Sequence, residues 1–210
     1  MNDLYINSYC YIHSSKIFKD GELIHNLEVV GIEDVLKSSY SLLMLNYPKY
    51  YKMDALSKLG IVGAELLFAD IALVNQFSKD NFAMIISNCD SSLDTDLKHQ
   101  AAFENTDAFF PSPAIFVYTL PNIVAGEIAI KHQLKGENIF YISNEFDAFQ
   151  TKILVENIFS KAQTDAALVG WVNVYQNNYE AFLMLVSPLP IGKKVLFRED
   201  NLNHLYDNKS

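Results

Sequence analysis

The chain has 210 residues, a formal net charge of −9 at pH 7 and a hydrophobic share of 50%. A chain of this length forms one domain with a substantial core. Its negative charge argues against nucleic acid, whose binding depends on Lys and Arg neutralising phosphates. The same charge disfavours a strongly acidic carrier protein as a direct partner, unless lysines cluster on one face.

Two further classes are disfavoured by the pattern of the chain. No apolar run approaches the ~20 residues of a membrane-spanning helix, and the N-terminus lacks the basic and apolar regions of a secretory signal. Two cysteines, Cys10 and Cys89, are too few for a disulfide framework, which predicts a reducing cytoplasm. Cys89 lacks a neighbouring histidine, and the charge of Asp90 is expected to raise the pKa of its thiol. We therefore expect no nucleophilic role for Cys89.

Hydrophobic periodicity predicts five segments in the first half of the chain. In chain order they are a strand over 4–12, polar irregular residues 14–51, a helix over 53–68, a buried strand over 82–87 and a helix over 91–103. Asp20-Gly21 is expected to form a turn within the irregular segment.

The second half predicts two more helices and three more strands. They are a helix over 126–134, a strand over 138–143, a helix over 147–162, strands over 165–174 and 180–187, and a polar tail over 193–210 whose residues 201–210 are frayed. Gly136 ends the first of these helices, as glycine does at a C-terminal cap. Asn144, Glu145 and Asp147 form a cluster of capping residues that starts the next helix at about Asp147. The strand over 165–174 is almost wholly apolar, which is typical of a parallel strand covered on both faces.

These elements predict an α/β fold with one mixed sheet. Four of the five strands form a parallel set, the fifth is an antiparallel edge, and helices cover both faces.

Five short segments carry a resemblance to a known family. They are Pro111-Ser112-Pro113, Leu120-Pro121-Asn122, Ala125-Gly126-Glu127, Leu134-Lys135-Gly136 and Asp165-Ala166-Ala167-Leu168-Val169-Gly170. At these segments the chain resembles the N-terminal half of the β-ketoacyl synthases, acyltransferases with the thiolase fold. It is similar to the short ketosynthase-like proteins of aryl-polyene and flexirubin-type pathways. The resemblance implies a thiolase-like half-fold over 1–192, a polar tail over 193–210, and the spatial strand order 3-2-1-4-5 with strand five antiparallel.

The position of the family's nucleophile holds a carboxylate in this chain. In the family a Gly-Pro pair precedes a strand that ends in Asp-Thr-Ala-Cys-Ser-Ser, and the cysteine accepts the acyl group. When Gly136 is laid on that glycine and Gly170 on the later Val-Gly, Glu145 falls on the cysteine. A helix N-terminus stabilises a carboxylate as it does a thiolate, but the carboxylate holds no stable thioester. Glu145 is then either a helix-capping carboxylate or a group that repels or orients an acyl thioester in a vestigial tunnel.

The two catalytic histidines of the family have no counterpart here. The five histidines of the chain are His13, His25, His99, His132 and His204, and none lies in a matching motif. We expect His99 and His132 on the solvated surface. The resemblance therefore implies a protein with no catalytic residue, no cofactor and no metal.

A half-length thiolase fold leaves one helix layer without its usual cover. The helix over 147–162 is the candidate, because its apolar residues leave little polar surface. Two remedies stay open, a homodimer or a heterodimer with a full-length ketosynthase, and the resemblance places residues 139–142 at that interface. The candidate acyl-binding or interface residues are Tyr118, Asn122, Ile139, Tyr141, Asn144 and Phe146.

Three functions are compatible with these observations. The first is a non-catalytic, chain-length-factor-like subunit that shapes the acyl tunnel of a true ketosynthase in bacterial polyketide or fatty-acid-type biosynthesis. The second is an active 3-oxoacyl synthase or acyltransferase with an unorthodox site. The third is a module that binds an acyl chain or an acyl carrier protein through the aromatic-rich residues 109–118. The missing thiol and imidazoles favour the first.

Overall fold

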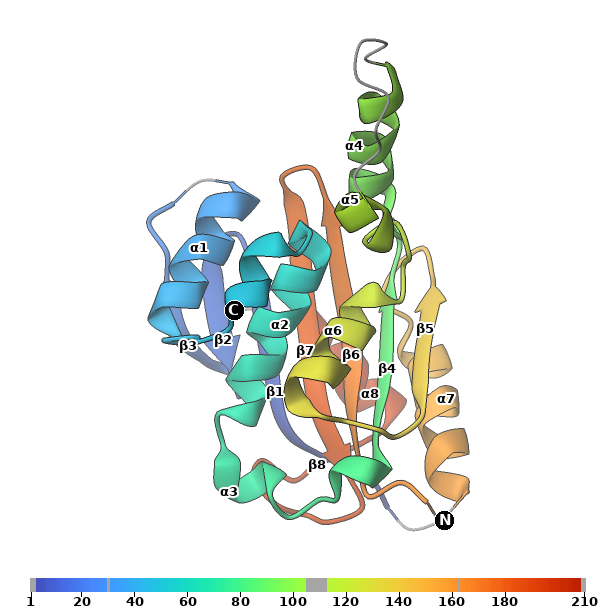
Figure 1. Ribbon diagram of the computed structural model, residues 1–210. Coiled ribbons are helices and arrows are strands. Elements are labelled where there is room, and N and C mark those ends of the chain that lie inside the picture. Colours follow the sequence, from blue (N-terminus) through green and yellow to red (C-terminus); the bar gives the residue numbers. More distant parts are fainter. Residues whose placement is uncertain (1–2, 30, 105–112, 162, 209–210) are drawn as a thin grey trace.

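The fold is a mixed β-sheet held between two layers of helices (Figure 1). The structure, a computed structural model, describes residues 3–29, 31–104, 113–161 and 163–208. The strands are β1 Tyr5–His13, β2 Lys16–Lys19, β3 Glu22–Asn26, β4 Phe82–Asn88, β5 Asn138–Ile142, β6 Ala166–Tyr175, β7 Asn178–Ser187 and β8 Val195–Leu196. The helices are α1 Ile32–Leu42, α2 Ala55–Phe68, α3 Ile71–Val74, α4 Leu93–Glu104, α5 Pro113–Val117, α6 Ile123–His132, α7 Ala148–Ser160 and α8 Glu199–Asp207, with short 3-10 helices η1 Pro48–Lys52 and η2 Lys79–Asn81.

The sheet confirms the predicted α/β class and corrects its details. The strand order is β3-β2-β1-β7-β6-β4-β5, with β8 on β1, so the described part of the chain has eight strands where five were predicted. The order 3-2-1-4-5 is wrong, because β4 pairs directly with β6 and leaves no place between them for β1. The antiparallel strand β7 is confirmed, but it lies inside the sheet: it forms a hairpin with β6 and pairs with β1 on its other side.

The segment predicted to be irregular, 14–51, contains β2, β3 and α1. Its two hairpins have two-residue loops, Ser14-Ser15 and Asp20-Gly21, and all four residues have positive φ, as type I′ turns require. The turn at Asp20-Gly21 is therefore confirmed. The side chain of Asp20 accepts hydrogen bonds from the amide of Tyr9 and the hydroxyl of Ser8, at 2.9 and 3.1 Å, which ties the second hairpin to β1.

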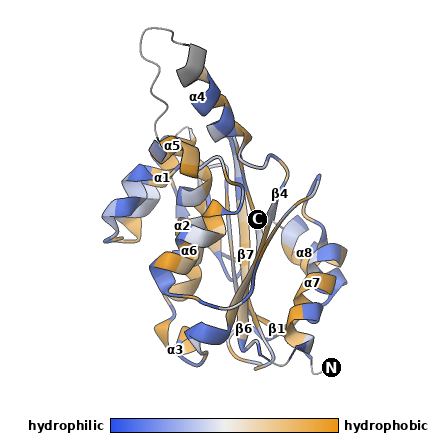
Figure 2. Cartoon of the chain, turned by 45° about the vertical axis from the view of Figure 1, so that its right-hand side comes forward, coloured by the Kyte–Doolittle hydropathy of each residue, from blue (hydrophilic) through white to orange (hydrophobic). Residues whose placement is uncertain are grey.

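The helices cover both faces of the sheet, as predicted. Figure 2 shows α1, α2 and α6 on one side and α7 and α8 on the other. The four predicted helices are α2, α4, α6 and α7, with ends within a few residues of the prediction. A Cβ at Gly60 would lie 2.4 Å from Cγ2 of Val124, and a Cβ at Gly63 would lie 2.8 Å from Cδ1 of Leu183. These two glycines therefore let α2 pack closely against both α6 and the sheet. Among the described residues, no helix combines the length and hydropathy needed to cross a bilayer.

The C-terminal segment is folded where it was expected to fray. Residues 199–207 form α8, whose Leu202 is fully buried and whose Tyr206 ring lies 4.7 Å from that of Phe146. Helix α8 packs beside α7 on the same face of the sheet (Figure 1). It thus supplies part of the cover that a half-length fold was expected to lack. On α7, Phe149 and Ile153 stay exposed, at 57% and 41%.

Replacing Leu202 by Ala tests whether α8 is part of the folded domain. The fully buried side chain loses its apolar contacts and leaves a cavity, so Leu202→Ala is expected to lower the free energy of unfolding by about 2–5 kcal/mol. Urea denaturation measures this change. The neighbouring exposed Asn203→Ala is the matched control, and equal stability of the two variants would mean that α8 is not docked.

Candidate functional site

The candidate site is the elbow, residues 143–147, that joins β5 to α7. Asp147 is the N-cap of α7, because its side chain accepts a hydrogen bond from the amide of Gln150 at 2.8 Å. The predicted start of this helix is confirmed. Glu145 lies exposed two residues earlier and does not form this cap. Because β5 is parallel to β4, the elbow lies at the carboxyl end of the parallel strands, the edge at which α/β folds place their sites.

A cavity of about 410 Å³ opens in front of the elbow. It is lined by Ser143, Asn144, Glu145, Phe146, Asp147, Ala148, Phe149, Glu199 and Asn203. The last two residues come from α8, which sequence patterns did not predict as a helix. Three of the lining residues are carboxylates and none is a cysteine or a histidine. This cavity offers anionic and amide groups, and no thiolate that could accept an acyl group.

The nearest free cysteine at this edge of the sheet follows β4 and is a poor nucleophile. The thiol of Cys89 donates to Oδ2 of Asp90 at 3.3 Å, and partial burial, followed by that carboxylate, raises its pKa to about 11. This confirms the expected effect of Asp90. The amide of Asn173 donates to the same carboxylate at 2.6 Å, so the group is held in place. At neutral pH Cys89 is therefore a protonated thiol. The other cysteine, Cys10, is buried, and burial raises its pKa to about 12.

A half-buried carboxylate, Glu180, supports the elbow through Tyr206. Glu180 accepts short hydrogen bonds from the hydroxyls of Tyr11 and Tyr206, which joins β7 to β1 and to α8. Burial and the Glu180 carboxylate raise the pKa of both phenols, so they stay neutral. The ring of Phe146 packs on Tyr206 and, at 5.3 Å, on Phe182. Phe146, predicted as a site residue, is thus a buried anchor of the elbow.

The histidines expected on the surface are partly buried. His132 Nε2 lies 2.8 Å from Oε1 of Glu65, and its ring packs 4.4 Å from that of Phe68. Burial disfavours the charged form of Glu65, but hydrogen bonds from His132 and Lys131 hold its pKa below the ordinary value. His99 is half-buried. The expectation of solvated side chains is wrong because the ring of His132 packs against Phe68 and that of His99 against Phe116.

The edge strand β5 brings together part of the predicted residue set. A second cavity, of about 590 Å³, lies along this edge and is lined by Pro121, Asn122, Asn138, Phe140, Tyr141 and Ile142. The hydroxyl of Tyr141 lies 2.8 Å from that of Thr151, while Ile139 packs into the core under α7. Ile142 is 56% exposed, and within the described part of the chain β5 pairs with β4 alone. The edge therefore carries both an apolar surface and unpaired backbone groups.

Tyr118 lies apart from this edge, in a buried polar cluster. Its hydroxyl donates to Oε1 of Glu127 at 3.0 Å, and Nζ of Lys49 lies 2.7 Å from the other oxygen of that carboxylate. Burial and the Glu127 charge raise the pKa of Tyr118. The cluster ties α5 and α6 to η1. Among the described residues, no group of three or more His, Cys, Asp and Glu side chains is placed to hold a metal ion.

Replacing Asp90 by Asn tests the electrostatic control of Cys89. Loss of the carboxylate lowers the pKa of the thiol, so more thiolate is present at pH 8. Each decrease of one unit in the pKa of Cys89 gives about tenfold faster alkylation by iodoacetamide, since the thiolate is the reactive form. Mass spectrometry of the modified peptide measures the rate. Asp94→Asn on α4 is the control, and equal rates in the two variants would contradict the assignment.

No family model and no curated protein matches the chain. Among solved structures, the ishigamide ketosynthase/chain length factor aligns with a TM-score of 0.66 and 15% identity over 88% of this chain and 62% of that chain. A ketosynthase in complex with its chain length factor from Xenorhabdus doucetiae aligns with a TM-score of 0.58 and 12% identity, over 89% of this chain and 79% of that chain. A type II acyl-carrier protein in complex with its ketosynthase aligns with a TM-score of 0.61 and 13% identity, over 97% of this chain and 65% of that chain.

The chain therefore spans less than two thirds of the length of two of these three structures. At identities of 12–15% the likeness is one of fold. It confirms the resemblance and the thiolase-like α/β class expected from the sequence. This chain has the fold of ketosynthases and chain length factors.

Proposed function

We propose that this protein is a non-catalytic ketosynthase-like subunit of polyketide or fatty-acid-type biosynthesis, similar in role to a chain length factor. One observation carries the proposal: the elbow of a ketosynthase fold presents Glu145 to a cavity lined by carboxylates and amides, with no thiol or imidazole. The ketosynthase reaction needs a thiol that holds the acyl group as a thioester, and an acylated carboxylate would be a reactive anhydride instead. The protein then acts through its surface. The free thiols Cys10 and Cys89 support a reducing, cytoplasmic location.

The partner in this proposal is a full-length ketosynthase, bound through the edge of β5. An edge strand with unpaired amide and carbonyl groups is a template for strand addition. Exposed Ile142 and the half-buried Phe140 add apolar area beside those groups, and the 590 Å³ cavity lies against the same strand. A homodimer through the same edge is the alternative arrangement. Among the structurally similar proteins, one ketosynthase is bound to its chain length factor and another to an acyl-carrier protein. A ketosynthase and an acyl-carrier protein are therefore the two partners to test.

An active synthase is the second candidate, and the chemistry of Cys89 argues against it. Burial and Asp90 keep this thiol protonated, and it lies outside the elbow cavity. A module that binds an acyl chain is the third candidate. Part of its proposed segment, 109–112, lies outside the described residues, while the β5-edge cavity offers an alternative place for an acyl chain.

Replacing Ile142 by Glu tests the proposed interface. A charge on the edge of β5 opposes strand addition, so Ile142→Glu is expected to reduce ketosynthase co-purified from the native host at least tenfold. Ile24→Glu is the matched control, because Ile24 lies on β3 at the opposite edge and is similarly exposed, 48% against 56%. Equal loss with both variants, or with neither, would contradict docking at β5.

A transfer assay with a radiolabelled acyl thioester separates the non-catalytic from the catalytic function. We expect no protein-bound label with the wild-type chain, and no change in Glu145→Gln, because neither side chain forms a stable thioester. The label is followed by gel autoradiography after removal of free thioester. Stable labelling that disappears in Cys89→Ala would establish an active thiol and overturn the proposal.

A further inference from the structure

The elbow cavity carries a negative charge that its surroundings do not balance. Its charged lining residues, Glu145, Asp147 and Glu199, are all carboxylates, and the lining contains no lysine, arginine or histidine. The helices α7 and α8 both begin at this cavity. Each helix N-terminus is equivalent to roughly +0.5 of an elementary charge, so the two offset about one of the three negative charges. The cavity therefore keeps a net negative charge.

Glu145 and Glu199 are the carboxylates that a bound group can pair with. Asp147 is already occupied, since it accepts the amide of Gln150 as the N-cap of α7. Glu145 is exposed and Glu199 is half-buried, and neither forms an ion pair with a residue that the structure describes. Arg198, the neighbour of Glu199 in the chain, lines a different cavity, in which two cations and two carboxylates cancel. A cation that enters the elbow cavity therefore meets two carboxylates that no described cation neutralises.

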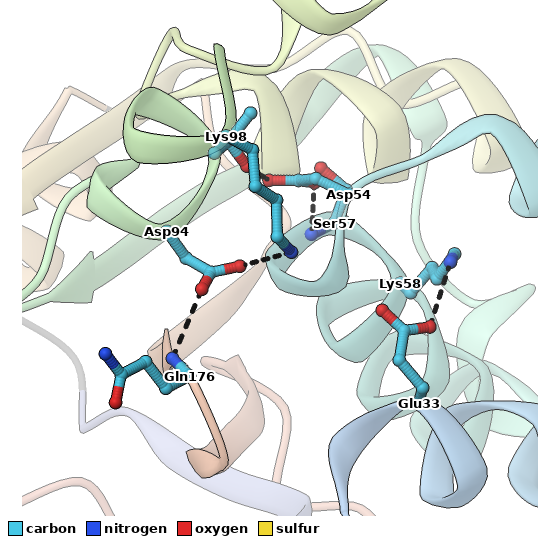
Figure 3. Close-up of polar contacts among 8 residues, drawn as sticks. Glu33, Asp54, Ser57, Lys58, Asp94, Lys98 and Gln176 are labelled. Carbon is cyan, nitrogen blue, oxygen red and sulfur yellow. Dashed lines mark hydrogen bonds and ion pairs between the residues drawn. The ribbon is translucent and has the colours of Figure 1, made fainter. Parts of the chain in front are cut away.

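Around α1, α2 and α4, by contrast, carboxylates are paired within the chain (Figure 3). Oε2 of Glu33 lies 3.5 Å from Nζ of Lys58, and Oδ2 of Asp94 lies 2.7 Å from Nζ of Lys98. Asp94 also accepts a hydrogen bond from the amide of Gln176 at 3.3 Å. These carboxylates have partners of their own. The unneutralised carboxylates at the elbow are thus a local feature of this surface, and not only a result of the net charge of −9.

An exposed apolar stripe on α7 begins at the same cavity. Phe149 lines the cavity and is 57% exposed, and Ile153 is 41% exposed. Because residues four apart lie on the same side of a helix, these two side chains are neighbours on the outer face of α7. We call Glu145, Glu199, Phe149 and Ile153 the elbow surface. It combines an anionic cavity with an apolar stripe one helical turn long.

Charge disfavours two occupants that the chain itself could supply. A second copy brings another net charge of −9, and a symmetric contact at this surface would place two anionic cavities together. The segment 105–112 contains one aspartate and no lysine or arginine. Complementarity therefore points to a partner with positive charge. Arginine fits both parts of the surface, because its planar guanidinium pairs with carboxylates and stacks on aromatic rings such as that of Phe149.

We propose that the elbow surface binds a basic amphipathic helix of a partner protein. An arginine of that helix enters the cavity, pairs with Glu145 and Glu199 and lies against the ring of Phe149. Apolar side chains at helical spacing on the partner cover Ile153, as when an amphipathic helix docks on an apolar groove. The inference does not rest on the proposed function, because it needs neither a ketosynthase nor the edge of β5.

Titration of a fluorescent peptide with the full chain, followed by anisotropy, tests the proposal. The probe is a peptide of about 14 residues, or four helical turns, with arginine on one face and leucine on the other. We expect saturable binding of this peptide, and none of a matched peptide in which glutamate replaces every arginine. A peptide of the same composition without the helical pattern is expected to bind at least about fivefold more weakly, because it cannot present both faces at once.

Single substitutions locate the binding surface. Glu145→Gln and Glu199→Gln are each expected to weaken binding about two- to fivefold, as for a partly exposed ion pair. Asp34→Asn is the matched control, because it makes the same charge change at an exposed carboxylate on α1. Phe149→Ala is expected to weaken binding at least about fivefold, as for an aromatic anchor of an interface. Its control is Leu23→Ala on β3, where the side chain is 52% exposed.

The proposal is overturned if the wild-type chain shows no saturable binding or if the glutamate peptide binds as tightly as the arginine peptide. It is also overturned if the elbow variants weaken binding no more than their controls, since the attraction would then follow from net charge alone. Light scattering examines the other occupant: a dimer that Phe149→Ala dissociates would assign the surface to a second copy instead. Circular dichroism confirms that each variant is folded. Failure here leaves the test of β5 with Ile142→Glu unaffected.

Discussion

The placement of the elbow depends on one close backbone contact. The amide of Gly136 donates to the carbonyl oxygen of Phe82 at 3.2 Å, and a Cβ at position 136 would lie 2.4 Å from that oxygen. Only glycine fits where the chain enters β5. The contact fixes the register in which Ile139 pairs with Ile85 of β4. Because a shift by one residue would turn every side chain of β5 to the other face, this register also decides that Ile139 and Tyr141 pack on the α7 side of the sheet and Phe140 on the opposite side.

Helix α8 covers part of the same face of the sheet as α7, so less apolar surface stays exposed on that face. A sheet of this kind must bury both faces. Leu202 and Tyr206 complete the core beside Phe146, so the helix α7 does not depend on a partner for most of its cover. The exposure that remains includes Ile142 on β5 and Phe149 on α7, one on each side of the elbow. The proposal therefore places the partner at this edge rather than over the whole helix layer.

Local patterns predicted α2, α4, α6, α7 and five of the strands, but they missed β2, β3, α1 and α8, and contacts between distant residues decided how the strands pair. Periodicity identified α2, α6 and α7, and the capping chemistry of Asp147 and the turn at Asp20-Gly21 were visible in the sequence. The turn at Ser14-Ser15 was missed because serine rarely adopts positive φ. The strand order was wrong because strand pairing is non-local. The support of the elbow was also hidden, since Glu180 bonds to tyrosines 169 and 26 positions away.

The proposed absence of ketosynthase chemistry rests on the surroundings of the elbow as well as on one residue. A thiolate needs a nearby positive charge or free amides at a helix N-terminus. Here Asp147 already occupies the N-cap of α7, and Glu199 of α8 faces the same cavity as Glu145. Two carboxylates would remain around a thiol placed at position 145, and each disfavours its deprotonation. Asp90 imposes the same effect on Cys89. This edge of the sheet carries anionic groups that oppose thiolate formation, and they support the proposed non-catalytic role.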